Sequence, residues 1–395
     1  MSLKRANGDG TIYLNAVRKR YECQFFYEDP FSGEKKKKKL VGKTIKNLEN
    51  RRKEYMEQIK KERSKVLSLH ASQGTVGEWL SEWLEQYVRP GVRVKSYERY
   101  QCSVTQHIVP YIGNIGIDQL TAEDVQKMLN ELLASGGELH QGLSPRTVNT
   151  ARRTLKTALD KAVHLRKIAY NPVEATKACR TEKPQIAVIT HEQAQGLLRV
   201  AKAEDQTAYM AILLALSTGM RIGEIFGLMW DNVDFSNKRL YVVQTLVSTS
   251  CGFSVEMSPK TKTSYRQIDL PRHCLDELQA HRAWQELRKA EWLNKYEDHN
   301  LVIGNSNGSY KDPKYFSYKI FKRLLAKTGI PPNVRFHDLR HTHATWLLEK
   351  GVHPKVVAER LGHSSIRITL DTYSHVIQGM QKIAVNKLDE IAEKW

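Results

Sequence analysis

Residues 337–351 read HDLRHTHATWLLEKG, and this stretch decides how the last part of the chain folds. The apolar residues around Trp346 predict a helix that packs on a core. Gly351 is expected to close that helix, because glycine readily adopts the left-handed backbone of a helix C-terminus. His337 and Arg340 are three positions apart, so a helix brings both side chains to one side. The stretch therefore predicts a helix that is apolar on one side and carries reactive polar groups on another.

Two further stretches carry residues of related chemistry. STGMRIGEIFGLMWDNVDF (217–235) ends one apolar helix and begins another, with Arg221 near the start of the second. The helix dipole disfavours a cation there, which points to an anionic partner, although a nearby glutamate could serve as well. VVAERLGHSSIRITLDTYSHV (356–376) places His363 at a break between helices and Tyr373 in or just after the last short helix.

These residue types together suit cleavage of a phosphodiester without a metal. Two arginines can clamp the non-bridging oxygens and offset the charge of the transition state. A tyrosine is the nucleophile, a histidine can take its proton, and a lysine can protonate the leaving 5′-hydroxyl. Each residue taken alone has an ordinary structural explanation, such as core packing or an ion pair. The ordered set Arg…Lys…His-x-x-Arg…His…Tyr favours catalysis.

A metal site is the weaker interpretation of the same histidines. His337 and His341 have the HxxxH spacing, and His343 and His363 follow. However, there is no HExxH motif, and no carboxylate stands at a ligand spacing. The five cysteines are scattered and none forms a CxxC, which argues against a disulfide framework or a cysteine zinc site and favours a reducing cytosol.

The composition bounds the function. The chain has 395 residues, enough for about two or three domains. The apolar fraction of 41% excludes general disorder, and the formal charge of +19 predicts a polyanionic partner. Nucleic acid is the leading candidate, and an anionic membrane surface is the weaker one. The longest apolar run, 208–220, is too short to cross a bilayer, and the first residues have no apolar segment typical of a signal peptide.

The first part of the chain is the most basic. Residues 1–68 hold 19 lysines and arginines against 9 acidic residues. Strand-like runs at 10–17 and 20–29, and a charged helical pattern over 44–67, predict a small sheet with one helix. The lysines of 35–39 could be a solvated edge strand, because lysines blunt sheet edges. Alternatively, the sheet enters a DNA groove with its lysines on phosphates.

The next part is helical, and the last is mixed. Between linkers at 70–74 and 181–185, helices are predicted at 76–88 and 95–112, and from Thr121 and Ser144 onward. Beyond 186, helices alternate with strand-like patches at 239–248 and 265–271. The exposed basic helix faces could be merely solvated, but the net charge favours DNA. The candidate DNA-binding residues of the first two parts are Arg18, Lys19, Arg20, Lys36, Lys38, Lys95, Ser96, Arg99, Arg146, Thr147, Arg152 and Arg153.

At these motifs the chain resembles the tyrosine recombinases of the phage-integrase family. TGMRIGEIFGL (218–228) resembles the family's first arginine box, and 337–351 with LGHSSIRITLDTYSHV (361–376) resembles its second. The helical part is similar to a core-binding domain. The basic first part resembles the arm-binding domain of integrases from temperate phages and conjugative transposons. The resemblance implies a multidomain α+β fold, with a small β-sheet-plus-helix arm-binding domain at 1–68, an all-α core-binding domain at 75–180, and a mainly α catalytic domain with a small antiparallel sheet at 186–395.

The resemblance also implies a role for each residue of the set. Arg221 and Arg340 would hold the scissile phosphate, and Tyr373 would attack it to leave a 3′-phosphotyrosyl link and a free 5′-hydroxyl. The other implied roles are Lys260 as general acid with Lys262 as the alternative, His337 as base, and His363 as hydrogen-bond donor to the phosphate or transition state. The covalent link conserves the bond energy, so no ATP, metal or other cofactor is implied.

The implied partners are DNA and further copies of the chain. A homotetramer would bind attachment sites of core and arm types and exchange strands in two steps through a Holliday junction. A DNA-bending protein and an excision factor would assist it. The reaction would take place in the bacterial cytoplasm, on the nucleoid. The amphipathic tail, about 377–395, either packs on its own core or docks on a neighbouring subunit. Two rivals remain: a type IB topoisomerase-like enzyme and a non-catalytic architectural DNA-binding protein.

Overall fold

The structure is a computed structural model. It describes residues 11–15, 20–28, 35–68, 74–137, 141–182, 186–250, 252–257 and 265–373, together with five positions of the tail. The chain divides into two compact units, Met1–Lys183 and Pro184–Trp395. Neither unit contains, in its described residues, a helix long and apolar enough to cross a membrane.

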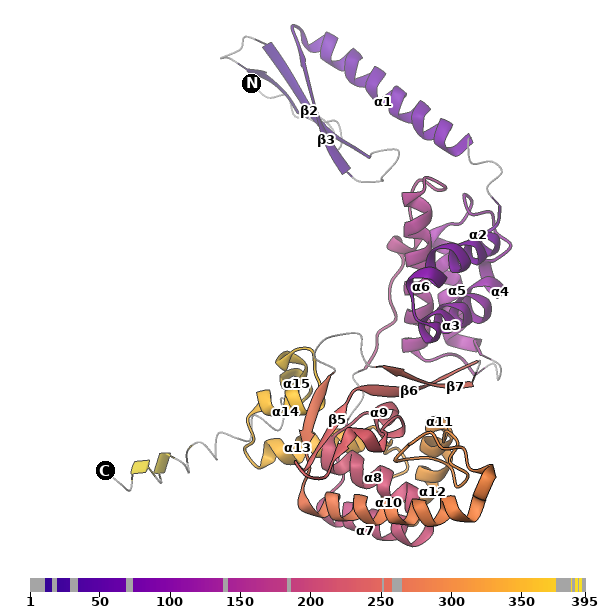
Figure 1. The fold of residues 1–395 in the computed structure, drawn as a ribbon. Coiled ribbons are helices and arrows are strands. Elements are labelled where there is room, and N and C mark those ends of the chain that lie inside the picture. Colours follow the sequence, from indigo (N-terminus) through magenta and orange to yellow (C-terminus); the bar gives the residue numbers. More distant parts are fainter. Residues whose placement is uncertain are drawn as a thin grey trace. The chain divides into compact units, whose positions relative to one another are not determined.

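The N-terminal part is a three-stranded antiparallel sheet with one helix lying along it (Figure 1). Its elements are β1 (Thr11–Asn15), β2 (Arg20–Glu28), β3 (Lys35–Gly42) and α1 (Ile45–Ser68). The strands run in the order β1-β2-β3, and Cys23 and Phe25 of β2 pack on Leu48 of α1. The small sheet with one helix expected from the sequence is confirmed.

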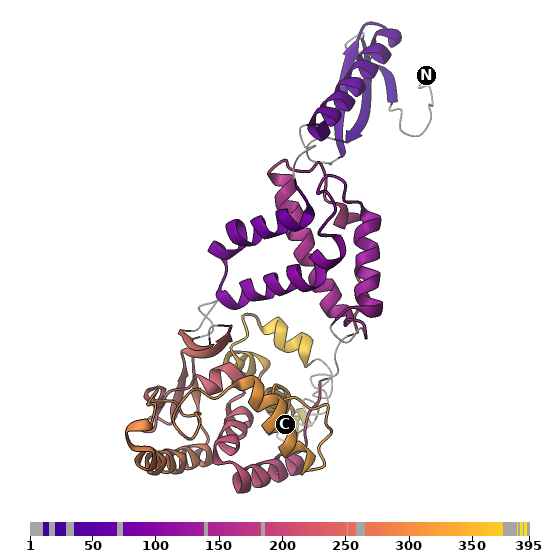
Figure 2. The same ribbon diagram turned by 90° about the vertical axis from the view of Figure 1, so that its right-hand side faces the viewer.

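The helical part that follows, whose helices Figure 2 shows packed together, has its own hydrophobic core. Its helices are α2 (Val76–Trp83), α3 (Val94–Cys102), α4 (Val109–Ile112), α5 (Ala122–Ser135) and α6 (Pro145–His164), with π-helical turns η1 (Leu84–Val88) and η3 (Ser103–Ile108) and short 3-10 turns η2 (Arg89–Gly91) and η4 (Pro172–Ala175). Thr121 caps α5 in a reciprocal capping box with Asp124, and Ser144 caps α6. The predicted helix starts are therefore confirmed.

The second unit is mainly helical around a large core. Its helices are α7 (His191–Glu204), α8 (Gln206–Thr218), α9 (Ile222–Phe226), α10 (Arg272–Trp292), α11 (Pro313–Tyr315), α12 (Phe321–Ala326), α13 (Asp338–Glu349), α14 (Pro354–Leu361) and α15 (Ile366–Thr372). Helix α8 is buried along nearly its whole length. That burial explains the apolar run at 208–220, because a helix buried on all sides is apolar all round.

The strands of this unit differ from the prediction of one strand over 239–248. The chain changes sheet at Val243, so this run forms β5 (Arg239–Val242) and β6 (Gln244–Thr249). Strand β5 joins β4 (Val233–Asp234) and β8 (Arg266–Asp269) in an antiparallel sheet of order β4-β5-β8, whereas β6 forms a hairpin with β7 (Gly252–Met257). The backbone hydrogen bonds of the two halves thus go to different partners, which a continuous apolar pattern does not reveal.

Candidate active site and nucleic-acid surfaces

Arg340 joins three helix ends. It lies on α13 and is only 3% exposed. Its Nη1 donates to the carbonyl oxygen of Gly219 over 2.7 Å, and its Nη2 donates to that of Leu361, also over 2.7 Å. Gly219 ends α8 with φ +67°, a conformation that favours glycine. Burial and the charge of the nearby Arg221 lower the pKa of Arg340 to about 9. Arg340 therefore remains a cation at neutral pH.

Arg221 stands at the N-cap of α9, where it pairs with a glutamate and also remains accessible to an anion, the two alternatives expected from the sequence. Its Nη1 donates to Oε1 of Glu224 over 2.7 Å, and its Nη2 donates to the carbonyl of Gly362 over 3.2 Å. Nevertheless its side chain is 42% exposed. The glutamate therefore fixes the guanidinium without hiding it, and an anion could still approach.

A third arginine, Arg266, which the sequence interpretation missed, also binds Glu224. Arg266 on β8 contacts both carboxylate oxygens of Glu224, at 3.2 and 2.7 Å, and donates from Nε to the carbonyl of Arg360. Burial opposes ionisation of Glu224. The hydrogen bonds and charges of Arg266 and Arg221 outweigh that effect and lower the pKa of Glu224 to about 2. The only sequence signal for Arg266 was its place in the strand-like patch at 265–271.

The two predicted catalytic histidines, His337 and His363, lie near the arginines. Burial, followed by the nearby His341, lowers the pKa of His337 to about 4. Burial and the charges of Arg340 and Arg221 lower the pKa of His363 to about 4 as well. Nδ1 of His363 lies 2.7 Å from Oγ1 of Thr369. Both imidazoles are therefore neutral at pH 7, which suits hydrogen bonding to a phosphate or proton acceptance.

Tyr373 follows α15 and is 1% exposed, with its ring packed among apolar residues of α13 and α14. Its hydroxyl oxygen lies 2.8 Å from Nδ1 of His341. Burial raises the pKa of Tyr373 to about 12, although the charge of Arg340 acts in the opposite direction. The sequence interpretation considered His341 only as a metal ligand, so its contact with the tyrosine is new.

His343 has a structural role. Its Nδ1 lies 2.7 Å from the carbonyl oxygen of Leu216, and Nε of Arg360 donates to its Nε2 over 3.1 Å. This pattern requires the neutral tautomer with the proton on Nδ1. Across the described residues, no group of three or more His, Cys, Asp and Glu side chains could hold a metal ion.

Several predicted residues lie outside the described part of the chain. These are Lys260, its alternative Lys262, Arg18, Lys19, and most of the tail.

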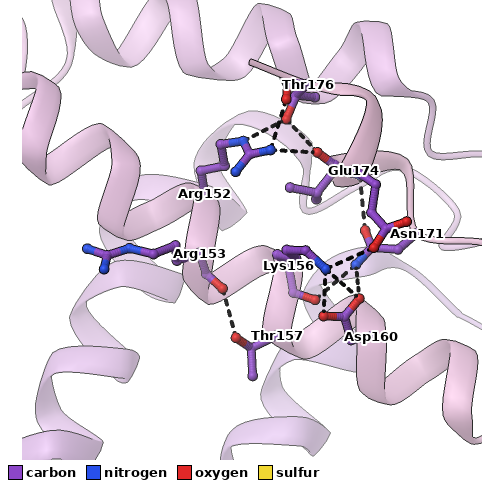
Figure 3. A network of polar contacts seen from close by, with 9 residues as sticks. Arg152, Arg153, Lys156, Thr157, Asp160, Asn171, Glu174 and Thr176 are labelled. Atoms are coloured by element: carbon purple, nitrogen blue, oxygen red, sulfur yellow. Dashed lines mark hydrogen bonds and ion pairs between the residues drawn. The ribbon is translucent and has the colours of Figure 1, made fainter. Parts of the chain in front are cut away.

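In the helical part, Arg152 and Arg153 differ although they are adjacent on α6. Arg152 is half-buried and donates to Oγ1 and the carbonyl of Thr176 and to the carbonyl of Val173, over 2.8 to 3.1 Å (Figure 3). Arg153 is exposed and points away from that network (Figure 3). The side chain of Arg152 thus holds the segment after α6 in place, whereas the exposed Arg153 donates within its own helix, to the carbonyl of Asn149 and the hydroxyl of Thr150.

A second group of contacts fixes the same segment. Lys156 pairs with Asp160 and Glu174, each at 3.0 Å, and the side-chain amide of Asn171 donates to Asp160 (Figure 3). The amide of Asn149 bonds to both backbone groups of Cys179, each over 2.8 Å. The segment after α6 is therefore held against α6 by side-chain hydrogen bonds and ion pairs as far as Cys179.

The other candidates of the helical part lie on α3 and α6, with Arg99 in the last turn of α3. Arg99 and Arg146 are exposed, and the half-buried Ser96 lies in the first turn of α3. Lys95 pairs with Glu98 at 3.4 Å, and the hydroxyl of Thr147 lies 2.9 Å from that of Ser144.

In the small sheet, strand register divides the lysines between two faces. Lys38 lies opposite Phe25, and Lys36 lies opposite Tyr27, so both belong to the face that carries the buried Phe25 and α1. Nζ of Lys38 lies 4.8 Å from the centre of the Tyr55 ring on α1. Lys37 lies opposite Phe26, which is 63% exposed on the other face. Arg20 is on that open face too, and its guanidinium lies 3.5 Å from Oε1 of Glu22.

Comparisons with known proteins agree with this arrangement of parts. The chain matches the phage integrase family over residues 187–379, and the N-terminal SAM-like domain of phage integrases over 75–133. It is 29% identical over 404 residues to a tyrosine recombinase XerC-like protein of Caldanaerobacter subterraneus subsp. tengcongensis, covering 96% of this chain and 98% of that protein. It is also 29% identical over 249 residues to the transposase from transposon Tn916 of Enterococcus faecalis, 59% of each chain.

Solved structures give the same fold. The Tn1549 transposon integrase in complex with transposon right end DNA superimposes with a TM-score of 0.66 at 22% identity, covering 78% of this chain and 99% of that one. A lambda integrase from a tetramer bound to a Holliday junction superimposes with a TM-score of 0.56 at 19% identity, covering 93% and 96%. The multidomain fold expected from the sequence is confirmed.

Proposed function

The chain belongs to the phage integrase family of tyrosine recombinases, and we propose from this that it cuts and rejoins DNA at specific sites to integrate and excise a mobile element or prophage. One observation carries the proposal. Arg221 and Arg340, from distant parts of the sequence, donate to the adjacent carbonyl groups of Gly362 and Leu361, beside His363. The charge of Arg340 also acts on the hydroxyl of Tyr373.

In the proposed mechanism the two arginines bind the scissile phosphate. Arg340 is held rigidly by two carbonyl groups, and Arg221 is partly exposed, so the pair presents a preorganised positive site. A bound phosphate would relieve the repulsion between the guanidiniums. His337 and His363, both neutral, would hydrogen-bond the phosphate or its transition state.

Tyr373 would attack the phosphorus and displace the 5′-oxygen of the DNA. The oxygen–phosphorus bond to the tyrosine forms while the phosphorus–5′-oxygen bond breaks. Lys260, with Lys262 as alternative, would protonate the leaving oxygen. The phosphotyrosyl link retains the energy of the broken bond, so rejoining needs no ATP.

DNA would be held by the first two parts as well as by the catalytic unit. We propose that the exposed Arg99, Arg146 and Arg153 contact core-site DNA. The open face of the small sheet, with Arg20 and Lys37, would contact arm-site DNA. Four copies would assemble on DNA, as the lambda integrase tetramer bound to a Holliday junction suggests. The tail would dock on a neighbouring copy. A DNA-bending protein and an excision factor would direct integration or excision in the bacterial cytoplasm.

The first test uses a nicked suicide duplex that carries the core site. Wild type and Tyr373→Phe are incubated with it in EDTA, and denaturing gels are examined for a covalent protein–DNA adduct. An adduct with wild type alone is expected. If a demonstrably bound site gives no adduct, the chain is a binding protein; if adducts form without site preference, a type IB topoisomerase-like enzyme is favoured.

A further inference from the structure

The hydroxyl of Tyr373, the proposed nucleophile, contacts His341, a histidine that has no role in the mechanism so far. His341 lies one helical turn after His337, and its Nδ1 is 2.8 Å from the hydroxyl oxygen of Tyr373. The ring of His337 instead meets the ring of His341 edge to face, with 5.1 Å between their centres. Of the two histidines, His341 is therefore the one placed to receive the tyrosine proton.

The state of His341 suits proton acceptance. Burial lowers its pKa, and the charges of Arg340 and Arg335 act in the same direction against the opposing charge of Asp338. The imidazole is thus neutral at pH 7. With its proton on Nε2, Nδ1 has a free lone pair directed at the phenol.

The tyrosine needs such an acceptor. With a pKa of about 12, only on the order of one Tyr373 in 10⁵ is ionised at pH 7. Arg340 lies close enough to favour the phenolate, but it cannot take a proton. Histidine is the side chain whose proton affinity matches this task near neutral pH.

Building on the proposed function, we propose that His341 is a further catalytic residue, which accepts the hydroxyl proton of Tyr373 at Nδ1 as the phenolic oxygen attacks the scissile phosphate. The new oxygen–phosphorus bond forms as the proton moves to His341, and the bond to the 5′-oxygen breaks. The leaving oxygen takes a proton from the general acid, proposed as Lys260. In rejoining, imidazolium at His341 returns the proton to the departing tyrosine.

The surroundings of His341 determine its pH response. Several titratable or charged groups lie around His341. They are His337, Asp338 and Arg340 around the start of α13, Arg335 before that helix, and His363 and Tyr373 from the C-terminal elements. Protonation of the imidazole removes the acceptor, so cleavage should fall as the pH decreases below the pKa of His341.

The test compares full-length variants on the nicked suicide duplex. In His341→Asn the amide oxygen takes the place of Nδ1 as hydrogen-bond acceptor but cannot hold a proton. Duplex binding and the melting temperature should match wild type, while the rate of adduct formation at pH 7 falls about 100-fold or more. The residual rate should rise about tenfold per pH unit from 7 to 9, because hydroxide then removes the proton. Imidazole added to His341→Ala should restore part of the rate.

A matched control and contrary outcomes make the test decisive. His353→Asn replaces a histidine that caps α14 with another good cap, so its adduct rate should be unchanged. A His341→Asn rate within about threefold of wild type would overturn the proposal. A faster rate would overturn it too, since the hydrogen bond would then restrain Tyr373. Should His341→Asn fail to fold, His341→Gln and the imidazole experiment carry the same comparison. If wild type itself formed no covalent adduct, the proposed function would be refuted instead.

Discussion

Glu224 and Arg266 form a buried ion pair, in which Nη2 of the arginine lies 2.7 Å from Oε2 of the glutamate. The two residues are 42 positions apart in the chain, and their side chains are 5% and 6% exposed. Arg221 binds the same carboxylate from the solvent side. The position of Arg221, which we propose contacts the phosphate, therefore depends on a residue of β8.

Removing Arg266 should destabilise the catalytic unit. Arg266→Met leaves the carboxylate of Glu224 buried with only one of its two arginine partners, and breaking a buried pair costs about 3–5 kcal/mol of unfolding free energy. Calorimetry of the full-length chain checks this value. Arg239→Met is the control, because Arg239 pairs with Asp269 near the surface and its loss should cost less than about 1 kcal/mol. Equal losses in both variants would contradict the structural role of Arg266.

Arg340→Lys should abolish cleavage more than binding. The guanidinium reaches the carbonyls of Gly219 and Leu361 at once, and a single ammonium cannot keep both bonds and a phosphate contact. Adduct formation should fall by about 10²–10³-fold, while affinity for the core site changes little. Arg367→Lys, at an 85% exposed side chain of α15, should leave adduct formation unchanged. A normal rate for Arg340→Lys would exclude a role for its fork geometry.

Acid should destabilise the catalytic unit through its buried histidines. Burial and the charge of Arg360 lower the pKa of His343 to about 4, below the usual value of 6.5. Between these values the unfolded chain binds more protons than the folded one, so the free energy of unfolding decreases as the pH falls from about 6.5 to 4. This histidine accounts for about 3 kcal/mol over that window, and its contribution is fully present above pH 6.5.

Urea unfolding at several pH values measures this effect. His343→Gln should make the dependence between pH 6.5 and 4 shallower, because glutamine does not titrate, whereas His337 and His363 still do. A slope unchanged in that variant would show that His343 does not carry the effect and would leave it to the other buried histidines.

Arg152 and Arg153 should have opposite effects when each is replaced by alanine. Arg153→Ala should weaken core-site binding and reduce the slope of log affinity against log salt by about 0.9, with an unchanged melting temperature. Arg152→Ala should lower the free energy of unfolding by about 1–3 kcal/mol, because it removes the charged bonds to the segment at Val173 and Thr176. Binding measured against salt and thermal unfolding separate the two. Identical behaviour of both variants would mean that the exposure difference has no functional meaning.

Much of the fold follows from local sequence signals. The capped helix starts at Thr121 and Ser144 and the close of α13 at Gly351 were predictable, since caps depend on residues within one turn. The break at Val243 was not, because it depends on which strand each half meets. The choice between Lys36 and Lys37 needed the pairing register, since a shift of one residue moves a side chain to the opposite face.

The sequence by itself determined the kind of chemistry, because arginine, histidine and tyrosine appear in a fixed order with recognisable spacing. Only the tertiary structure decided which groups touch. It placed His341 rather than His337 on the hydroxyl of Tyr373, and it brought Arg266 to Glu224. It also gave Arg152 hydrogen bonds to the segment after α6 and left the adjacent Arg153 exposed. Proton transfer and ion pairing depend on distances of about 3 Å between atoms that are distant along the chain, and such distances are fixed only when the helices and strands pack.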